Sequence, residues 1–274
     1  MVGFDWHGSG HQFLKIDGVA LEARAWGPPP SAACTIILLH EGLGSVAMWR
    51  DFPQALADRT DCGVLAYSRQ GYGASDACAL PRPLDYMERE ARDVLGPVLD
   101  ASGVRQAVLF GHSDGGSIAA LYAGFKPDPR VRGIVLMAPH FFVEDVSIHA
   151  IERARAAWRE TDLPVRLGKY HTRPEIAFRG WNNAWLNPGF RAWDIRDALA
   201  ELRVPCLAIQ GHQDPYGTAA QVKIIEERSP SPVAIHLLDD CEHSPHREQS
   251  ERTLALIADF VRSLDPASGA EVAP

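Results

Sequence analysis

The chain has 274 residues, of which 46% are hydrophobic and 23% charged, and its formal net charge is −8. This composition is typical of a globular protein, and the length fits one α/β domain with an inserted subdomain better than two independent domains. The acidic balance, with no basic run to offset it, argues against a nucleic-acid partner or an anionic membrane surface. The sequence shows neither a signal-peptide pattern nor a membrane-spanning window, so we expect a cytoplasmic protein.

The cysteines are odd in number, widely spread and without a C-x-x-C spacing. We interpret all of them as structural thiols rather than as redox groups or zinc ligands, and we expect neither a metal nor a cofactor. They are Cys34, Cys62, Cys78, Cys206 and Cys241.

The chain opens with two extended segments, 12–16 and 19–26, joined by Asp17-Gly18. That dipeptide supplies the positive φ angles of a tight hairpin turn, which predicts an antiparallel pair of strands. The next run, 35–39, is apolar on both faces, which is typical of a central buried strand.

Strands and helices then alternate as far as residue 137, which favours crossover connections and a mostly parallel sheet. The alternation stops between about residues 141 and 198, where residues 146–160 have helical spacing and no strand is predicted. The predicted elements before this break are strands 64–67, 104–110 and 131–137 and helices 48–58 and 84–99.

We interpret residues 141–198 as a helical cap inserted into an α/β core that comprises residues 1–140 and 199–265, with a tail over 266–274. Alternation resumes after the cap. The predicted elements there are strands 206–210 and 233–238 and helices 217–228 and 248–264.

The stretch 107–116 reads Ala-Val-Leu-Phe-Gly-His-Ser-Asp-Gly-Gly and joins a predicted strand to a predicted buried helix over 117–122. It contains the pattern G-x-S-x-G, from Gly111 to Gly115. A serine hydroxyl is a poor nucleophile unless a tight turn holds it facing outward, with glycines where a Cβ would collide with neighbouring backbone. The pattern therefore indicates that Ser113 is a nucleophile.

An acid and a histidine follow in the order that this pattern requires. Asp214 comes soon after the strand that ends at Gln210, and His243 soon after the strand that ends at Leu238. The carboxyl ends of parallel strands share one edge of the sheet, so these side chains can meet Ser113 there. His243 would accept the serine proton, and Asp214 would fix the imidazole tautomer and stabilise the imidazolium.

Other residues could take these roles. Glu144 and Asp145 follow the strand that ends near residue 137 and could supply the acid, and His246 could serve as the base. His243 and His246 lack an obvious third ligand, so we do not expect a zinc site.

An acyl-transfer reaction needs two N–H donors for its oxyanion. We expect one from the backbone of Asp114 and the other from the loop after strand 35–39, with Gly42 as the first choice and Leu43 as the alternative. We interpret the Asp114 carboxylate itself as a solvated or helix N-terminal acid with no part in the chemistry.

Taken together, these motifs resemble the α/β-hydrolase superfamily over residues 34–264. The resemblance implies a mostly parallel central sheet flanked by helices, with a helical cap after the sixth strand, and a serine hydrolase with a nucleophile elbow and a Ser-Asp-His triad. It rests on Leu38-Leu39-His40-Glu41-Gly42, on residues 68–75 (Ser-Arg-Gln-Gly-Tyr-Gly-Ala-Ser), on Gly111-His112-Ser113-Asp114-Gly115-Gly116, on Gly211-His212-Gln213-Asp214 and on His243-Ser244-Pro245-His246.

Two positions depart from the pattern of that superfamily. Glu41 stands where members commonly have glycine, which puts an ionisable carboxyl near the site, and Ser68 stands where members commonly have aspartate. Haloalkane dehalogenases and epoxide hydrolases resemble this chain in fold but use aspartate at the elbow, so Ser113 argues against both activities.

Residues 150–200 carry nine Lys plus Arg against six Asp plus Glu, and four of the seven tryptophans. A cationic, aromatic cap would favour an aromatic or anionic acyl group. We prefer the interpretation that these side chains dock the cap on the core and keep its surface solvated. The residues that we expect to line a substrate pocket are Glu41, Leu43, His140, Phe141 and Trp181.

The sequence therefore predicts a cofactor-independent serine hydrolase whose partner is a small-molecule ester or lactone, cleaved through an acyl-enzyme. A hydrolase of carbon-carbon bonds in ring-cleavage products would use the same triad. An acyltransferase, or a ligand-binding protein that keeps the fold without turnover, are further alternatives. Oligomeric state has no signature in the sequence.

Overall fold

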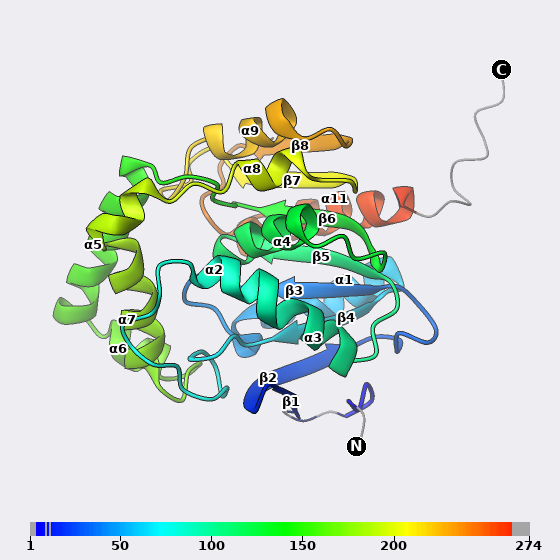
Figure 1. Ribbon diagram of the computed structural model, residues 1–274, viewed down its shortest axis with the longest axis horizontal. Coiled ribbons are helices and arrows are strands. Elements are labelled where there is room, and N and C mark those ends of the chain that lie inside the picture. Colours follow the sequence, from blue (N-terminus) through cyan, green and yellow to red (C-terminus); the bar gives the residue numbers. More distant parts are fainter. Residues whose placement is uncertain (1–3, 9, 11, 265–274) are drawn as a thin grey trace.

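The computed structural model describes residues 4–8, 10 and 12–264, and its centre is an eight-stranded sheet (Figure 1). The proposed tail over 266–274 lies outside the described residues. The strand order is β1-β2-β4-β3-β5-β6-β7-β8. The strands are β1 (Gln12–Ile16), β2 (Val19–Trp26), β3 (Thr35–Leu39), β4 (Gly63–Tyr67), β5 (Ala107–His112), β6 (Val131–Met137), β7 (Cys206–Gly211) and β8 (Val233–Leu238).

The sheet is mostly parallel, as the alternation of elements predicted. Only β1 with β2 and β2 with β4 pair antiparallel, while every other neighbouring pair is parallel. Asp17 and Gly18 have φ angles of 48° and 85° in the first hairpin. The carboxyl ends of the six parallel strands therefore share one edge of the sheet.

Helices cover both faces of the sheet, because successive side chains in the central strands point to opposite sides. Ile37 and Leu39 join the core on one face with α3 and α4, whereas Ile36 and Leu38 join the core on the other face with α1 and α11. The helices of these layers are α1 (Phe52–Thr60), α2 (Tyr86–Arg89), α3 (Leu95–Ala101), α4 (Asp114–Phe125), α8 (Asp197–Ala200), α9 (Ala220–Arg228), α10 (Pro245–Glu248) and α11 (Ser250–Ser263).

Several predicted boundaries were wrong. The helix expected over 217–228 begins at Ala220, and the helix expected over 248–264 is divided at Gln249 between α10 and α11. The helix expected over 48–58 is a 3-10 turn (Val46–Trp49) followed by α1, because Arg50 has a φ of 55° and interrupts the helical path. The helix expected over 84–99 contains a π-helical turn (Glu90–Val94) between α2 and α3. The strand expected from residue 104 begins at Ala107.

The segment between β6 and β7 carries α5 (Asp145–Glu160), α6 (Leu163–Leu167), α7 (Pro174–Trp185) and a 3-10 turn (Pro188–Ala192). Helices α5, α6 and α7 gather at one end of the sheet (Figure 1). Trp158 of α5 stacks on Phe178 of α7, with ring centroids 4.2 Å apart. Aromatic packing thus joins two helices of this segment to each other.

No helix in the described part of the chain combines the length and the apolar character that crossing a bilayer requires.

Candidate active site

Ser113 occupies a strained turn between β5 and α4. Its φ and ψ are 53° and −119°, a conformation that a residue with a Cβ adopts only under constraint. The neighbouring glycines allow the turn to close: a Cβ on Gly111 would lie 2.0 Å from the carbonyl oxygen of Gly115, and a Cβ on Gly115 would lie 2.0 Å from that of Leu39. The geometry is that of a nucleophile elbow.

Asp214 and His243 meet at the same edge of the sheet, after β7 and β8. Nδ1 of His243 lies 2.9 Å from each carboxylate oxygen of Asp214. Burial lowers the pKa of His243, but the charge and hydrogen bond of Asp214 outweigh it, so the pKa is raised. Burial raises the pKa of Asp214, yet the same imidazole more than offsets this and holds the pKa below its usual value. The pair is therefore built to stabilise an imidazolium.

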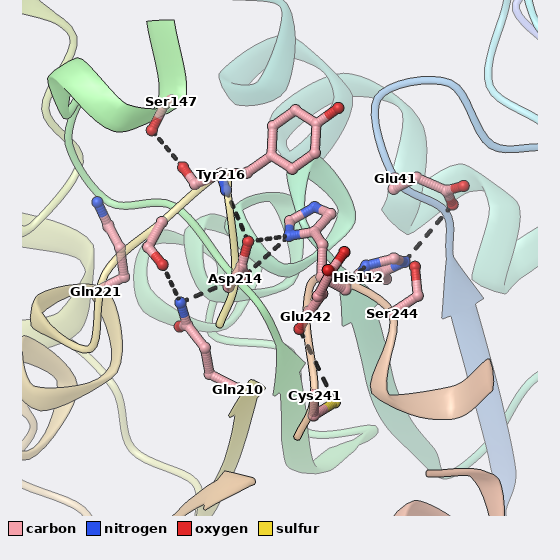
Figure 2. A network of polar contacts seen from close by, with 12 residues as sticks. Glu41, His112, Ser147, Gln210, Asp214, Tyr216, Gln221, Cys241, Glu242 and Ser244 are labelled. Carbon is pink, nitrogen blue, oxygen red and sulfur yellow. Dashed lines mark hydrogen bonds and ion pairs between the residues drawn. The ribbon is translucent and has the colours of Figure 1, made fainter. Parts of the chain in front are cut away.

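Asp214 is itself fixed by two donors. The backbone N–H of Tyr216 donates to Oδ1 at 2.8 Å, and Nε2 of Gln210 lies 3.4 Å from Oδ2 (Figure 2). These contacts orient the carboxylate toward the imidazole, so the aspartate does not depend on His243 alone for its position.

The backbone around His243 is held from two sides. The carboxylate of Glu248 accepts the N–H of Ser244 at 2.9 Å and also the N–H of Glu242. Nε2 of His112 donates to the carbonyl oxygen of His243 at 2.7 Å. The loop that carries the imidazole is thus fixed on both flanks of His243.

Ser113, Asp114 and His243 line one cavity of about 310 Å³, a volume that suits a small molecule. The described contacts include no direct hydrogen bond between the Ser113 hydroxyl and His243. In enzymes without bound substrate, the distance between nucleophile and base is often too long for such a bond and shortens when substrate binds. The lining residues are Glu41, Gly42, Leu43, His112, Ser113, Asp114, His140, Ser147, Ile151, Trp181, Trp185, Pro215, Tyr216, Glu242, His243, Ser244 and Glu248.

The loop after β3 places Gly42 and Leu43 at this cavity, opposite the start of α4. Arg69 stabilises this loop, because its guanidinium donates to the carbonyl oxygen of His40 and, at 3.0 Å, to that of Glu41. In the described part of the chain, the backbone amides of Gly42, Leu43 and Asp114 donate to no other residue. All three amides are available as oxyanion donors.

The Asp114 carboxylate is not solvated, which corrects the sequence interpretation. It lies at the first position of α4 as expected but is fully buried, and it accepts hydrogen bonds from Tyr86 at 2.5 Å and Trp185 at 3.3 Å. Burial raises its pKa, although the Arg69 guanidinium 3.8 Å away acts in the opposite direction. Asp114 thus joins the elbow to α2 and to α7.

Glu41 extends into the cavity beside His112, with Oε2 3.7 Å from Nδ1 of that imidazole (Figure 2). Burial raises the pKa of the Glu41 carboxyl, but His112 outweighs it, and the pKa lies well below its usual value. The unusual residue in the sequence pattern is therefore an ionised group at the site.

Not all of the remaining residues that we expected in the pocket line the cavity. Leu43, His140 and Trp181 line the cavity, whereas Phe141 does not. Phe141 is fully buried, and its ring belongs to the hydrophobic core that packs on the α3 and α4 face of the sheet. Its N–H donates to Gln221 at 2.8 Å.

The competing acids and base lie away from the cavity. Glu144 accepts hydrogen bonds from Thr218 and Gln221, and Asp145 forms an exposed ion pair with Arg191. His246 packs against Trp49 and Phe52, and burial lowers its pKa to about 2. Within the described residues, no group of three or more His, Cys, Asp or Glu side chains is arranged to hold a metal ion.

Sequence reasoning missed several residues of the site. Of these, His112 had a signal, since it is the variable residue before the nucleophile in G-x-S-x-G. No sequence signal marked Trp185, Tyr216 or Glu248, because each of them reaches the cavity only through tertiary packing.

Comparison with known proteins agrees with this architecture. Residues 36–256 match the model of the alpha/beta hydrolase family, and the chain belongs to that family. Solved structures with the same fold include an enol-lactonase from Burkholderia xenovorans LB400, with a TM-score of 0.70 and 21% identity over 92% of this chain and 100% of that one. The esterase RhEst1 from Rhodococcus sp. ECU1013 has a TM-score of 0.70 and 24% identity over 93% of this chain and 99% of that one.

Curated relatives match over different extents. Serine hydrolase BPHL of Homo sapiens is 25% identical over 91% of this chain and 85% of its own length. The 3-oxoadipate enol-lactonase 1 of Acinetobacter baylyi is 25% identical over 90% of this chain and 95% of its own length. Epoxide hydrolase B of Mycobacterium tuberculosis is 34% identical, but the match spans only 46% of this chain and 34% of that protein.

Proposed function

We propose that this protein is a serine hydrolase that cleaves a small carboxylic ester or lactone through an acyl-enzyme. The observation that carries the proposal is the pairing of His243 Nδ1 with both oxygens of Asp214 in the cavity that holds Ser113 on its strained turn. The names of the relatives, which include an enol-lactonase and an esterase, support a substrate of this class.

In the first step, the Ser113 hydroxyl attacks the acyl carbon while Nε2 of His243 accepts its proton. Asp214 stabilises the imidazolium that forms, consistent with the raised pKa of His243. The negative charge on the carbonyl oxygen is met by the backbone N–H of Asp114 and that of Gly42, with Leu43 as the neighbouring donor. His243 then protonates the leaving alcohol.

In the second step, a water molecule gives a proton to His243 and attacks the acyl-enzyme. The Ser113 oxygen leaves and recovers its proton from the imidazole, and the carboxylic acid is released. In a lactone the alcohol and acid stay in one molecule, so the same two steps open the ring.

We also propose that residues 141–198 act as a cap over the site. Ser147 and Ile151 of α5 and Trp181 and Trp185 of α7 supply one wall of the cavity, and the core supplies the rest. The cap would then shape the acyl pocket while the triad remains on the core.

The experiment is to replace Ser113 by Ala and to assay p-nitrophenyl acetate hydrolysis together with covalent labelling by a fluorescent organophosphonate. We expect both signals to fall to background, while exposed Ser31→Ala keeps both. Turnover or labelling that persists in Ser113→Ala would refute the proposal. A vinylogous 1,5-diketone acid, assayed beside the ester, separates ester cleavage from carbon-carbon bond cleavage.

A further inference from the structure

The cavity is lined by acidic side chains and by no lysine or arginine among the described residues. Glu41, Glu242 and Glu248 all contribute to its wall. Glu41 is ionised, and Asp214 adds a further carboxylate next to His243. The site therefore places several negative charges around the nucleophile.

No lysine or arginine side chain among the described residues reaches the cavity wall to neutralise these carboxylates directly. No lysine or arginine of residues 141–198 contributes to the cavity wall, and Arg153, which acts electrostatically on Tyr216, is not part of it. The buried Arg69 guanidinium donates to the carbonyl oxygens of His40 and Glu41 and lies 3.8 Å from Asp114, so it is engaged behind the wall. Burial lowers the pKa of His140 to about 3, so that imidazole lines the cavity as a neutral group.

A second feature of the cavity also suits a cation. Trp181, Trp185 and Tyr216 form aromatic walls, and a ring face attracts a cationic group when water is excluded. In addition, Nδ1 of His112 has no hydrogen-bond partner although the residue is only 1% exposed, and it faces the Glu41 carboxylate. That nitrogen lies 3.7 Å from Glu41 Oε2, while the other ring nitrogen donates to the His243 carbonyl oxygen, so His112 positions the Glu41 carboxylate at the wall near Ser113.

Glu41 is well placed to sense charge on the acyl chain. It directly precedes Gly42, the candidate oxyanion donor, and it lines the same cavity as Ser113. The Glu248 carboxylate already accepts two backbone N–H groups, and Glu242 is exposed to solvent. Both residues therefore add negative charge at the cavity but are less suited than Glu41 to contact the acyl group.

We propose that the cavity selects esters by charge, in the order cationic, neutral, anionic acyl group, with Glu41 as the main determinant. The substrate class is then an ester or lactone whose acyl part carries an ammonium group or no charge, and not a carboxylate. This inference rests on the proposed esterase function. It is opposite to the alternative interpretation of the cap, in which cationic side chains would favour an anionic acyl group.

The test uses three ethyl esters that differ in acyl charge: ethyl 4-(trimethylammonio)butyrate, ethyl butyrate and monoethyl succinate. Hydrolysis is followed by pH-stat titration at pH 8 as kcat/KM. A unit charge about 7 Å away in a medium of effective dielectric about 30 changes the rate about tenfold. We expect a gain of about that size for the cation and a loss of about that size for the anion, both reduced at high salt.

Glu41→Gln should reduce the differences in kcat/KM among the three esters, and it should raise the ratio of kcat/KM for monoethyl succinate to that for ethyl butyrate about tenfold. The matched control is Glu152→Gln, which removes a charge from α5 outside the cavity and should leave the ratio unchanged. Equal rates for the three esters, or a ratio that Glu41→Gln does not move, would overturn the charge proposal. If none of the esters is hydrolysed, and p-nitrophenyl acetate is not hydrolysed either, it is the esterase function that fails.

Discussion

Replacing Asp214 by Asn tests the central contact of the site. An asparagine has one acceptor oxygen, but the position holds donors on both sides: Tyr216 N–H at 2.8 Å from Oδ1 and Gln210 Nε2 at 3.4 Å from Oδ2. The tighter Tyr216 contact should keep the oxygen at Oδ1 and put the NH₂ at Oδ2; both positions lie 2.9 Å from His243 Nδ1, so an NH₂ donor replaces one of its two acceptors. That amide favours the tautomer with its proton on Nε2, which cannot accept the serine proton.

We therefore expect kcat to fall about 10⁴-fold, the size of loss seen when a triad aspartate is replaced in this way. That loss corresponds to about 5 kcal/mol of transition-state stabilisation. The pH dependence should move as well. Because His243 must be neutral to act as a base, activity falls as pH drops through its pKa, which lies above the usual 6.5. Without the Asp214 charge, burial remains as the main influence and the inflection should move to lower pH.

The assay is the pH dependence of kcat/KM for p-nitrophenyl acetate from pH 5 to 9, with thermal melting to confirm that the variant folds. Asp194→Asn is the matched control, since Asp194 pairs with Arg196 at the surface. A folded Asp214→Asn protein with activity within tenfold of the wild type, and an unmoved inflection, would refute the reasoning.

Substitutions at four positions test other parts of the site. Gly42→Ala would put a Cβ 2.2 Å from the Trp181 indole, so we expect the loop to shift and kcat/KM for p-nitrophenyl acetate to fall at least about tenfold. Glu248→Ala should lower kcat more than it raises KM, and Glu248→Gln should recover part of the loss; equal activity of both variants with the wild type would contradict the loop-holding role. His246→Gln should retain hydrolysis within about tenfold, whereas His243→Gln should lose about 10³-fold, and the reverse result would make His246 the base.

Much of the architecture was predictable because its signals are local. The apolar run 35–39 and the Asp17-Gly18 turn of the first hairpin depend only on adjacent residues, and both strands of that hairpin have the predicted bounds. The G-x-S-x-G pattern carries its own steric reason, since glycine is required wherever the turn brings backbone within 2.0 Å of a Cβ position. The order of Ser113, Asp214 and His243 followed from the rule that parallel strands end at one edge.

Helix boundaries were less predictable, because they depend on single backbone angles. The φ of 55° at Arg50 and the π-helical turn before Leu95 have no clear hydrophobic pattern. The direction of a side chain is equally hard to predict from local sequence, as Phe141 illustrates. An aromatic residue just past a strand end can face the cavity or the core, and only the packing around it decides which.

The sequence by itself determined the fold class and the identity and order of the candidate triad, because these depend on periodicity, turn chemistry and strand order. Only the tertiary structure decided what surrounds the triad. The contact from His112 to the His243 carbonyl joins residues 131 positions apart, and the burial of Asp114 depends on Trp185, 71 positions away. Such contacts arise when distant segments pack together, so the charge and shape of the cavity have no signature in any local stretch of the chain.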